Sequence, residues 1–505
     1  MGTYRKRIES ASVYDVAIQS PLEAAPQLSE RLGNTVLLKR EDLQPVHSFK
    51  LRGAYNKVAK LSAKQRVRGV ICASAGNHAQ GLALAASRAG IKSLIVMPRT
   101  TPSIKVEAVK RFGSRILLHG DTYDEAYEEA RRQAAERGMS FVHPYDDPDV
   151  IAGQGTVGME ILRQHPGKLD AVFVPVGGGG FIAGVAAYIK AVRPKVKVIG
   201  VEPEDAACLQ AALKTGKRVV LDQIGLFADG VAVRQAGAEP FKLARRYVDE
   251  VVTASVDEIC AATRDIFEEN RSLPEPAGAL ALAGLKNHVA AKKWSGKTLV
   301  AIESGSNVNF DRLRHIAERA EIGEHREALL AVTIPERPGS FRQFCADLGK
   351  RGITEFNYRY ADRQAAHIFV GVRLQDGVNE KDELVAQLRA SDYAVADLTD
   401  NEMAKVHVRY MVGGRASGVD NEILFRFEFP ERPGALLQFL NQIGSRWNIS
   451  LFHYRNHGAA YGRVLVGMQV PSKELRECRR RLDEIGYEYA EESDNRAYDL
   501  FLGSA

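Results

Sequence analysis

The sequence predicts an α/β first half followed by an α+β second half that is built twice. Three observations lead to this fold class. The chain has 505 residues, 45% hydrophobic and 26% charged, so its composition is globular and its length exceeds what one core usually serves. Short apolar runs alternate with helical stretches from about residue 35 to 320. After about residue 322 the rhythm changes and a sequence repeat appears.

The first half predicts a parallel sheet covered by helices. The apolar run 69–74 precedes a helical stretch that begins at His78, and the run 93–98 precedes one at Ser103. A third run, 171–176, is followed by a helix at Phe181. Strands that alternate with helices in this way pair in parallel.

The second half is a near-duplication at an offset of 94 to 96 residues. PERPG at 335–339 returns at 430–434, and the F-x-Y-R segment at 356–359 returns at 452–455. Each copy has the order strand, helix, strand, strand, helix, strand, which is the split βαβ pattern of ferredoxin-like modules. The Gly-rich segment 412–418 is the expected linker. The predicted domains are 1–321, 322–411 and 412–505.

Composition excludes several classes of partner and site. The 69 basic and 63 acidic residues are interspersed, so the net charge of +6 gives no concentrated surface for nucleic acid. Five cysteines, widely spaced and without a C-x-x-C pair, argue against a disulfide framework and against a metal site. The N-terminus lacks a signal-peptide core, and no apolar stretch is long enough to span a membrane. We therefore expect a cytoplasmic protein.

A run of four glycines, Gly177 to Gly180, is the first candidate binding element. It follows the strand 171–176 and opens the helix at Phe181. Backbone N–H groups without neighbouring Cβ atoms can converge on an anion at a helix N-terminus, so a phosphate is the expected occupant. A plain strand-to-helix turn would also favour glycine, and the run is not the spaced G-x-G-x-x-G of dinucleotide folds.

Three further segments contain candidate polar groups. Lys50 lies in HSFKLRGA, Asn77 in SAGNHAQG after a strand, and Ser304 in ESGSNVN after another strand. Taken singly, Lys50 would be a surface lysine, and Asn77 and Ser304 would be helix caps. Ligands of open α/β sheets gather where parallel strands end, which favours a shared site.

Together these segments resemble the threonine and serine dehydratase family of fold-type II pyridoxal-phosphate enzymes. The blocks S-F-K-x-R-G-A, S-A-G-N-H-x-Q-G, G-G-G-G and S-G-x-N occur in the family's order, and the resemblance spans nearly the whole chain. It implies a tryptophan-synthase-β-like catalytic domain with pyridoxal 5'-phosphate. The duplicated half looks like the paired ACT-like regulatory modules of the biosynthetic members of the family.

The resemblance also implies a role for each candidate residue. Lys50 would form the Schiff base with the cofactor and remove the Cα proton of the substrate. Asn77 would contact the ring hydroxyl, and Ser304 would face the pyridine nitrogen. The cofactor phosphate would be held by Gly177, Gly178, Gly179, Gly180 and Phe181, and the substrate carboxylate by Ser74, Ala75 and Gly76. The implied reaction is dehydration and deamination of L-threonine to 2-oxobutanoate and ammonia, the committed step of isoleucine biosynthesis.

Two residue types narrow the chemistry within that family. A neutral hydroxyl at Ser304 lets the pyridine ring stay unprotonated, which favours loss of the β-hydroxyl over transamination. Serine racemases place a second serine at the position of Ala75, and alanine has no proton to give. Glu275 matches a family position near the active site, and it is equally typical of a helix-capping acid.

Alternatives remain for the substrate and for the regulatory half. L-serine is an alternative substrate, and a non-catalytic amino-acid sensor is the alternative of a different class. By resemblance, isoleucine inhibits and valine opposes it, and the assembly is a homotetramer. The expected effector contacts are Gly339, Tyr358, Gly434 and Tyr454. The two tyrosines would also suit plain sheet packing, and the modules would also suit oligomerisation alone.

Overall fold

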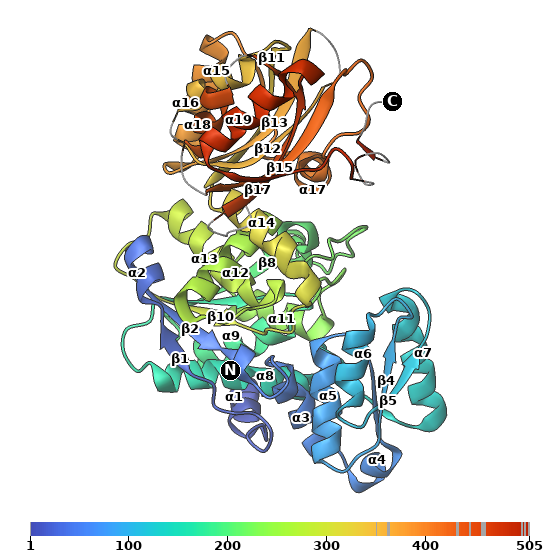
Figure 1. Cartoon of the computed structure of the whole chain (residues 1–505). Helices are drawn as coiled ribbons and strands as arrows, with labels where there is room; N and C mark the ends of the chain where they lie inside the picture. Colours follow the sequence, from blue (N-terminus) through green and yellow to red (C-terminus); the bar gives the residue numbers. More distant parts are fainter. Residues whose placement is uncertain are drawn as a thin grey trace. The chain divides into compact units, whose positions relative to one another are not determined.

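The computed structural model describes residues 2–349, 351–360, 364–430, 434–443, 446–455, 461–495, 498 and 501–502. The chain folds into two compact units, Met1–Ala320 and Glu321–Ala505. Figure 1 traces both units along the sequence, and each is described here by itself. Within the described ranges, no helix combines the length and the apolar character that crossing a bilayer requires.

The first unit is built around a six-stranded sheet with the order β1-β2-β10-β7-β8-β9. All neighbours pair in parallel except β1, which is antiparallel to β2. The predicted parallel α/β sheet is confirmed. The strands are β1 (Leu22–Ala24), β2 (Thr35–Arg40), β7 (Ala171–Pro175), β8 (Lys197–Pro203), β9 (Glu250–Ala254) and β10 (Thr298–Glu303).

A second, smaller sheet in this unit has four parallel strands in the order β5-β4-β3-β6. Its central strand β3 is entirely buried, as its uninterrupted apolar sequence VICA requires. The predicted strand 69–74 extends one residue beyond β3 at each end. Gly69 and Ser74 each make a backbone hydrogen bond to a neighbouring strand, but the strand itself comprises only Val70–Ala73. The strands are β3 (Val70–Ala73), β4 (Ser93–Met97), β5 (Arg115–Leu118) and β6 (Ser140–Phe141).

Helices cover these sheets, and local side chains define several of their starts. Ser62, Thr122 and Ser255 each begin a helix with a reciprocal capping box, so the backbone N–H groups of the first turn are satisfied locally. The helices are α1 (Gly2–Glu9), α2 (Pro26–Leu32), α3 (Lys50–Ala59), α4 (Ala63–Arg68), α5 (Asn77–Arg88), α6 (Ser103–Lys110), α7 (Tyr123–Arg137), α8 (Pro148–Gln164), α9 (Gly180–Val192), α10 (Cys208–Thr215), α11 (Ala238–Tyr247), α12 (Val256–Asn270), α13 (Pro276–Lys292) and α14 (Leu313–Gly323).

A buried charge network fixes α3 against the body of the first unit. The guanidinium of Arg52 donates to both carboxylate oxygens of Glu41, at 2.7 and 2.8 Å, and to Glu160 at 2.6 Å. Lys39 donates to the other oxygen of Glu160 at 2.6 Å, and all four side chains are inaccessible to solvent. The network is electrically neutral. It holds the helix that begins at Lys50.

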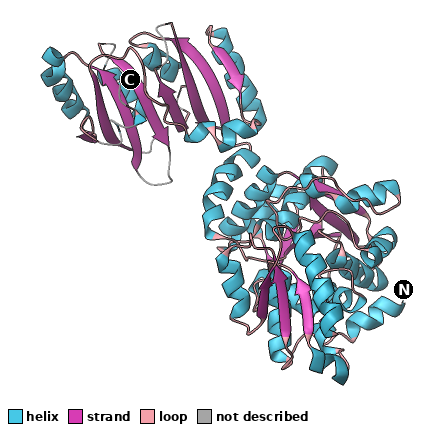
Figure 2. Cartoon of the chain, turned by 90° about the vertical axis from the view of Figure 1, so that its right-hand side faces the viewer, coloured by secondary structure: helices cyan, strands magenta, loops and turns pink. Residues whose placement is uncertain are grey.

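The second unit is one continuous eight-stranded sheet with the order β14-β11-β13-β12-β16-β17-β15-β18 (Figure 2). The repeated order of strands and helices predicted for the two modules is confirmed. The first module contains β11 (Glu327–Pro335), α15 (Ser340–Asp347), β12 (Ile353–Arg359), β13 (Ala365–Arg373), α16 (Gly377–Ala390) and β14 (Ala394–Asp397). The second contains β15 (Glu422–Pro430), α18 (Ala435–Ile443), β16 (Asn448–Arg455), β17 (Tyr461–Gln469), α19 (Leu475–Ile485) and β18 (Glu488–Glu491).

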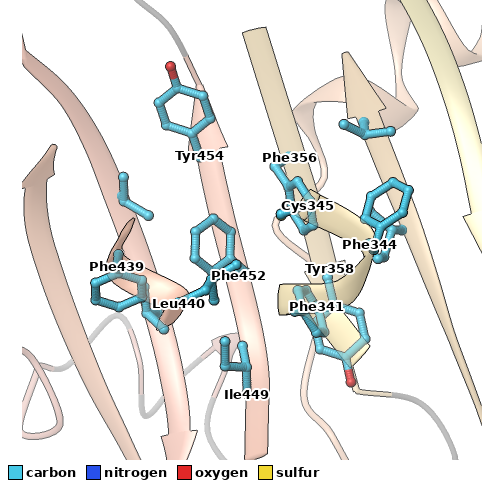
Figure 3. Close-up of a cluster of buried hydrophobic side chains, with 14 of the residues drawn as sticks. Phe341, Phe344, Cys345, Phe356, Tyr358, Phe439, Leu440, Ile449, Phe452 and Tyr454 are labelled. Atoms are coloured by element: carbon cyan, nitrogen blue, oxygen red, sulfur yellow. The ribbon is translucent and has the colours of Figure 1, made fainter. Parts of the chain in front are cut away.

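The two modules join through antiparallel pairing of β12 with β16. Phe356 lies opposite Tyr454, and Tyr358 lies opposite Phe452, so the repeated F-x-Y segments face each other in reverse order. The rings of Phe356 and Phe452 meet edge to face with centroids 5.2 Å apart (Figure 3). A single hydrophobic core therefore serves both modules and includes side chains of α15, α16, α18 and α19.

Between the modules lies a short helix that the sequence did not predict. α17 (Glu402–Val406) is capped by Asn401 and leads into a 3-10 turn, Val408–Tyr410. In that turn Arg409 reaches back and donates to Glu355 of β12 at 3.0 Å. The Gly-rich segment 412–418 that follows has no helix or strand.

Candidate active site

The candidate residues meet where the parallel strands of the first unit end. β3, β7 and β10 lead directly into the segments that contain Asn77, the four glycines and Ser304. Since β7 and β10 pair in parallel in one sheet, their following residues emerge at the same edge. Ser48 pairs with Gly305 through an isolated bridge, which brings the segment before Lys50 to that edge as well.

Lys50 is the first residue of α3, and its side chain is partly buried. Nζ donates to the backbone carbonyl of Pro144 at 3.4 Å and lies 5.3 Å from the centroid of the Phe49 ring. Burial lowers the pKa of this amine to about 8, although the carboxyl of Glu275 acts in the opposite direction. A substantial fraction of Lys50 is thus neutral near pH 8, which is the state that a nucleophilic or basic lysine needs. The plain surface-lysine interpretation is wrong.

Phe49 and Phe181 link the lysine to the glycine run. Their rings stack with centroids 3.9 Å apart and an angle of 11° between the planes. Phe181 lies in the first turn of α9, directly after Gly180. The stack therefore fixes the N-terminus of α9 relative to Lys50.

Two of the four glycines leave no room for a side chain. A Cβ on Gly178 would overlap the Tyr145 ring, and one on Gly180 would lie 2.5 Å from the Tyr145 carbonyl oxygen. Gly179 has a φ of +87° and is the N-cap of α9. A backbone without Cβ atoms that opens a helix matches the chemistry of a phosphate site, because first-turn N–H groups lack partners within their helix. The residues present fit the phosphate of pyridoxal phosphate.

Asn77 is held by two other side chains. Its Nδ2 donates to Oε1 of Glu275 at 2.5 Å, and its Oδ1 accepts from Nδ2 of Asn307 at 2.6 Å. The helix-cap interpretation is wrong for Asn77, because α5 has Gly76 as N-cap and no side-chain capping bond. The side chain is turned toward the site instead.

Ser304 is buried at the end of β10, and its Oγ donates to the carbonyl of Ala277 at 3.1 Å. It begins no helix, since the next helical turn, Phe310–Arg312, is capped by Asn309. A hydroxyl has one proton, so Ser304 would have to turn away from Ala277 to donate to a ligand.

The loop of Ser74, Ala75 and Gly76 is only partly buried, unlike the strand before it. Oγ of Ser74 accepts from the N–H of Gly76 at 3.3 Å. A Cβ on Gly76 would have no atom within 4 Å, so there is open space beside its backbone. This geometry suits a small anion held by backbone N–H groups.

Glu275 has a larger part in the site than the sequence indicated. It is 4% exposed and makes no capping bond to α13, so its carboxyl is not a helix cap. Burial, with a further contribution from the negative charge of Asp229, raises its pKa to about 7, although Asn77 and Lys105 act in the opposite direction. It borders a cavity of about 50 Å³ whose wall also includes Lys105, Asp229 and Arg312. The match to a family position was the signal for this acid, because its local pattern is that of an ordinary residue before a helix.

In the second unit the structure brings two of the four predicted effector residues to one turn. The hydroxyl of Tyr358 donates to Glu336, which lies in the turn that ends at Gly339. Glu336 also accepts from Nδ2 of Asn448 in β16 at 2.9 Å, so the second module reaches this turn. Gly339 has a φ of +92°.

The second copy of the turn is described only in part. Gly434 has a φ of +85°, as a left-handed turn position requires. Residues 431–433, which belong to the predicted effector turn, lie outside the described residues. Tyr454 is 9% exposed and lies beside Phe356 on the paired strand (Figure 3).

Comparison with known protein families gives one match in the first part of the chain and two matches of a second family in the rest. The family described as pyridoxal-phosphate dependent enzyme matches residues 13–305. The family described as C-terminal regulatory domain of threonine dehydratase matches twice, at residues 318–408 and 413–502.

Relatives match along the full length. The chain is 56% identical over 502 residues to the biosynthetic L-threonine dehydratase IlvA of Burkholderia multivorans, covering 99% of both chains. It is 54% identical to that of Escherichia coli over 499 residues, covering 99% of this chain and 97% of the other. The structure of processed threonine deaminase isoform 2 from Solanum lycopersicum matches with a TM-score of 0.62 and 47% identity, over 63% of this chain and 92% of that one.

Proposed function

The chain belongs to the pyridoxal-phosphate-dependent threonine dehydratases of the biosynthetic type, and on that premise we propose how its residues share the reaction. The reaction converts L-threonine to 2-oxobutanoate and ammonia, the committed step of isoleucine biosynthesis. One observation carries the site assignment: a partly buried lysine with a lowered pKa lies at the strand edge where the four glycines open a helix.

The cofactor would be held by residues from four segments. Lys50 is the amine that carries it, and Asn77 meets the ring hydroxyl. Ser304 meets the ring nitrogen, and the phosphate lies on the backbone of Gly177, Gly178, Gly179, Gly180 and Phe181. Pyridoxal 5'-phosphate bound here supplies the electron-withdrawing ring that makes the substrate Cα–H acidic.

Lys50 is also the base for the substrate proton. Its lowered pKa keeps a useful fraction neutral, so the amine can take the Cα proton and hold it near the leaving hydroxyl. The open backbone of Ser74, Ala75 and Gly76 orients the substrate through its carboxylate. Because Ala75 has no proton to give to the opposite face, elimination is favoured over racemisation.

Keto-acid release from purified enzyme tests this assignment. With threonine, 2-oxobutanoate should form faster than pyruvate forms from serine. One methyl group contributes only about 1 to 3 kcal/mol to discrimination, so serine should also react. Absence of any keto acid with bound cofactor would favour an amino-acid sensor, and faster pyruvate release would make serine the substrate.

The second unit would sense isoleucine as inhibitor and valine as its antagonist. Two hydrogen bonds support an effector site at Gly339 and Tyr358. The Tyr358 hydroxyl and the Asn448 amide of the other module both donate to Glu336. By the repeat, Gly434 and Tyr454 form the corresponding site. Coupling of about 1 to 3 kcal/mol would change affinity 5- to 150-fold. A chain truncated after residue 321 that kept its full isoleucine response would contradict this assignment.

Assembly, location and domain boundaries complete the proposal. We place the boundaries at 1–321, 322–411 and 412–505, which agrees with the division after Ala320 and with the two regulatory matches. A homotetramer in the cytoplasm is the expected state. Mass measurement in solution by light scattering checks the tetramer.

A further inference from the structure

Four groups form one hydrogen-bonded line beside the proposed cofactor site. Nδ2 of Asn307 donates to the backbone carbonyl of Val46 at 2.8 Å and to Oδ1 of Asn77 at 2.6 Å. Nδ2 of Asn77 in turn donates to Oε1 of Glu275 at 2.5 Å. The line therefore runs from a backbone carbonyl through two amides to a carboxyl.

The carbonyl of Val46 sets the direction of this line. A carbonyl oxygen only accepts, so Asn307 must turn its NH2 group toward it. The second proton of that NH2 group goes to Asn77, which must therefore present its oxygen to Asn307 and its NH2 group to Glu275. One N–H of Asn77 then remains, with no partner among the described residues.

We propose that Asn307 and Glu275 are positioning residues that orient the Asn77 amide so that an N–H, and not the carbonyl, faces the ring oxygen of the cofactor. This inference rests on the proposed function. An N–H stabilises an oxygen that carries negative charge, whereas a carbonyl oxygen in its place repels that charge. Reversal of the amide thus replaces an attraction by a repulsion.

Asn307 is needed in addition to Glu275 because burial lets the Glu275 carboxyl take up a proton. Asp229 faces it as a negative group, while Lys105 and Lys50 face it as positive groups, and with burial its pKa lies at about 7. A protonated carboxyl can donate to the Asn77 oxygen, and this hydrogen bond would stabilise the reversed orientation of the amide. Asn307 prevents that reversal, since it contacts the other end of the amide.

The test uses Asn307→Asp in the full-length holoenzyme. Its carboxylate only accepts, so Asn77 must reverse and give its NH2 group to the new acid. The readouts are the yellow absorbance band of the bound cofactor and the dissociation constant for pyridoxal phosphate. We expect a displaced band and binding weaker by about tenfold, the effect of about one hydrogen bond.

Asn401→Asp is the matched control, since it makes the same chemical change in the second unit. The Asn401 side chain accepts from the N–H of Ala404 at 3.0 Å, which an aspartate reproduces. Its band and dissociation constant should equal those of the unmodified enzyme. The same band and affinity in Asn307→Asp would overturn the inference while leaving the proposed function in place.

Glu275 variants provide a second measurement should Asn307→Asp fail to fold. Glu275→Gln keeps an acceptor for Asn77 and should keep the band, whereas Glu275→Leu should displace it. Equal bands in these two variants, or a displaced band in both, would refute the positioning role. If the unmodified protein showed no yellow band after incubation with pyridoxal phosphate, the cofactor assignment would fail, and the inference with it.

Discussion

Replacing Arg52 with methionine should destabilise the first unit strongly. The change removes the guanidinium that donates to Glu41 and Glu160 and leaves the rest of the network with one net negative charge. Glu160 keeps Lys39 as a partner at 2.6 Å. Glu41 keeps only neutral donors, Ser20 and Gln44. An uncompensated buried carboxylate is the main cost.

The size of the effect follows from the burial. Removing one partner of a buried ion pair costs about 3 to 5 kcal/mol. Unfolding entropy is about 2.1 cal/mol/K per residue, hence roughly 0.7 kcal/mol/K for a unit of 320 residues. The melting temperature of the first unit should therefore fall by about 4 to 7 °C.

Scanning calorimetry of matched variants checks this value. Arg52→Lys keeps the charge but loses the paired N–H groups, so it should lose less stability than Arg52→Met. The double variant Arg52→Met/Glu41→Gln should recover part of the loss, because it removes the uncompensated charge. A methionine variant as stable as the parent, or a double variant less stable than the single one, would refute the electrostatic reasoning.

Three other predictions address the cofactor and effector sites. Cofactor uptake by the apoprotein needs the neutral amine of Lys50, whose pKa is about 8. The uptake rate, followed by stopped-flow absorbance, should therefore increase about tenfold per pH unit below 8 and level off above it. A pH-independent rate would contradict this. Gly178→Ala puts a methyl group against the Tyr145 ring and should weaken cofactor binding at least tenfold by equilibrium dialysis, while Gly414→Ala, where a Cβ meets no atom within 4 Å, should not. Tyr358→Phe removes the hydroxyl that donates to Glu336 in the effector turn. In the keto-acid assay, the isoleucine concentration for half-inhibition should rise about tenfold. An unchanged concentration would place the effector elsewhere.

The parts of the fold that follow from local pattern could be predicted from sequence. The buried run Val70–Ala73 and the strands of both modules have short apolar patterns, bounded by turn residues, that favour strands. The positions of Asn77, the glycines and Ser304 after strand ends likewise followed from chain order. These features depend on neighbours within a few residues.

Features that depend on distant partners could not be predicted. Arg52 and Lys39 would be expected at the surface, and they are buried only because acids from other segments neutralise them. Glu275 stands before a helix, where an acid usually caps, yet its carboxyl bonds Asn77, 198 positions away. Asn307 belongs to the S-G-x-N block, but its orientation depends on the Val46 carbonyl, 261 positions away.

The antiparallel contact of β12 with β16 has a consequence for any shortened form of the chain. Because the contacting segments are near copies in reverse order, β12 of a first module produced alone would present an unpaired edge that complements a second β12. Two such fragments could rebuild the central contact between themselves. A chain with two linked copies thus contains within itself the strand pairing that a single copy would have to obtain by dimerisation.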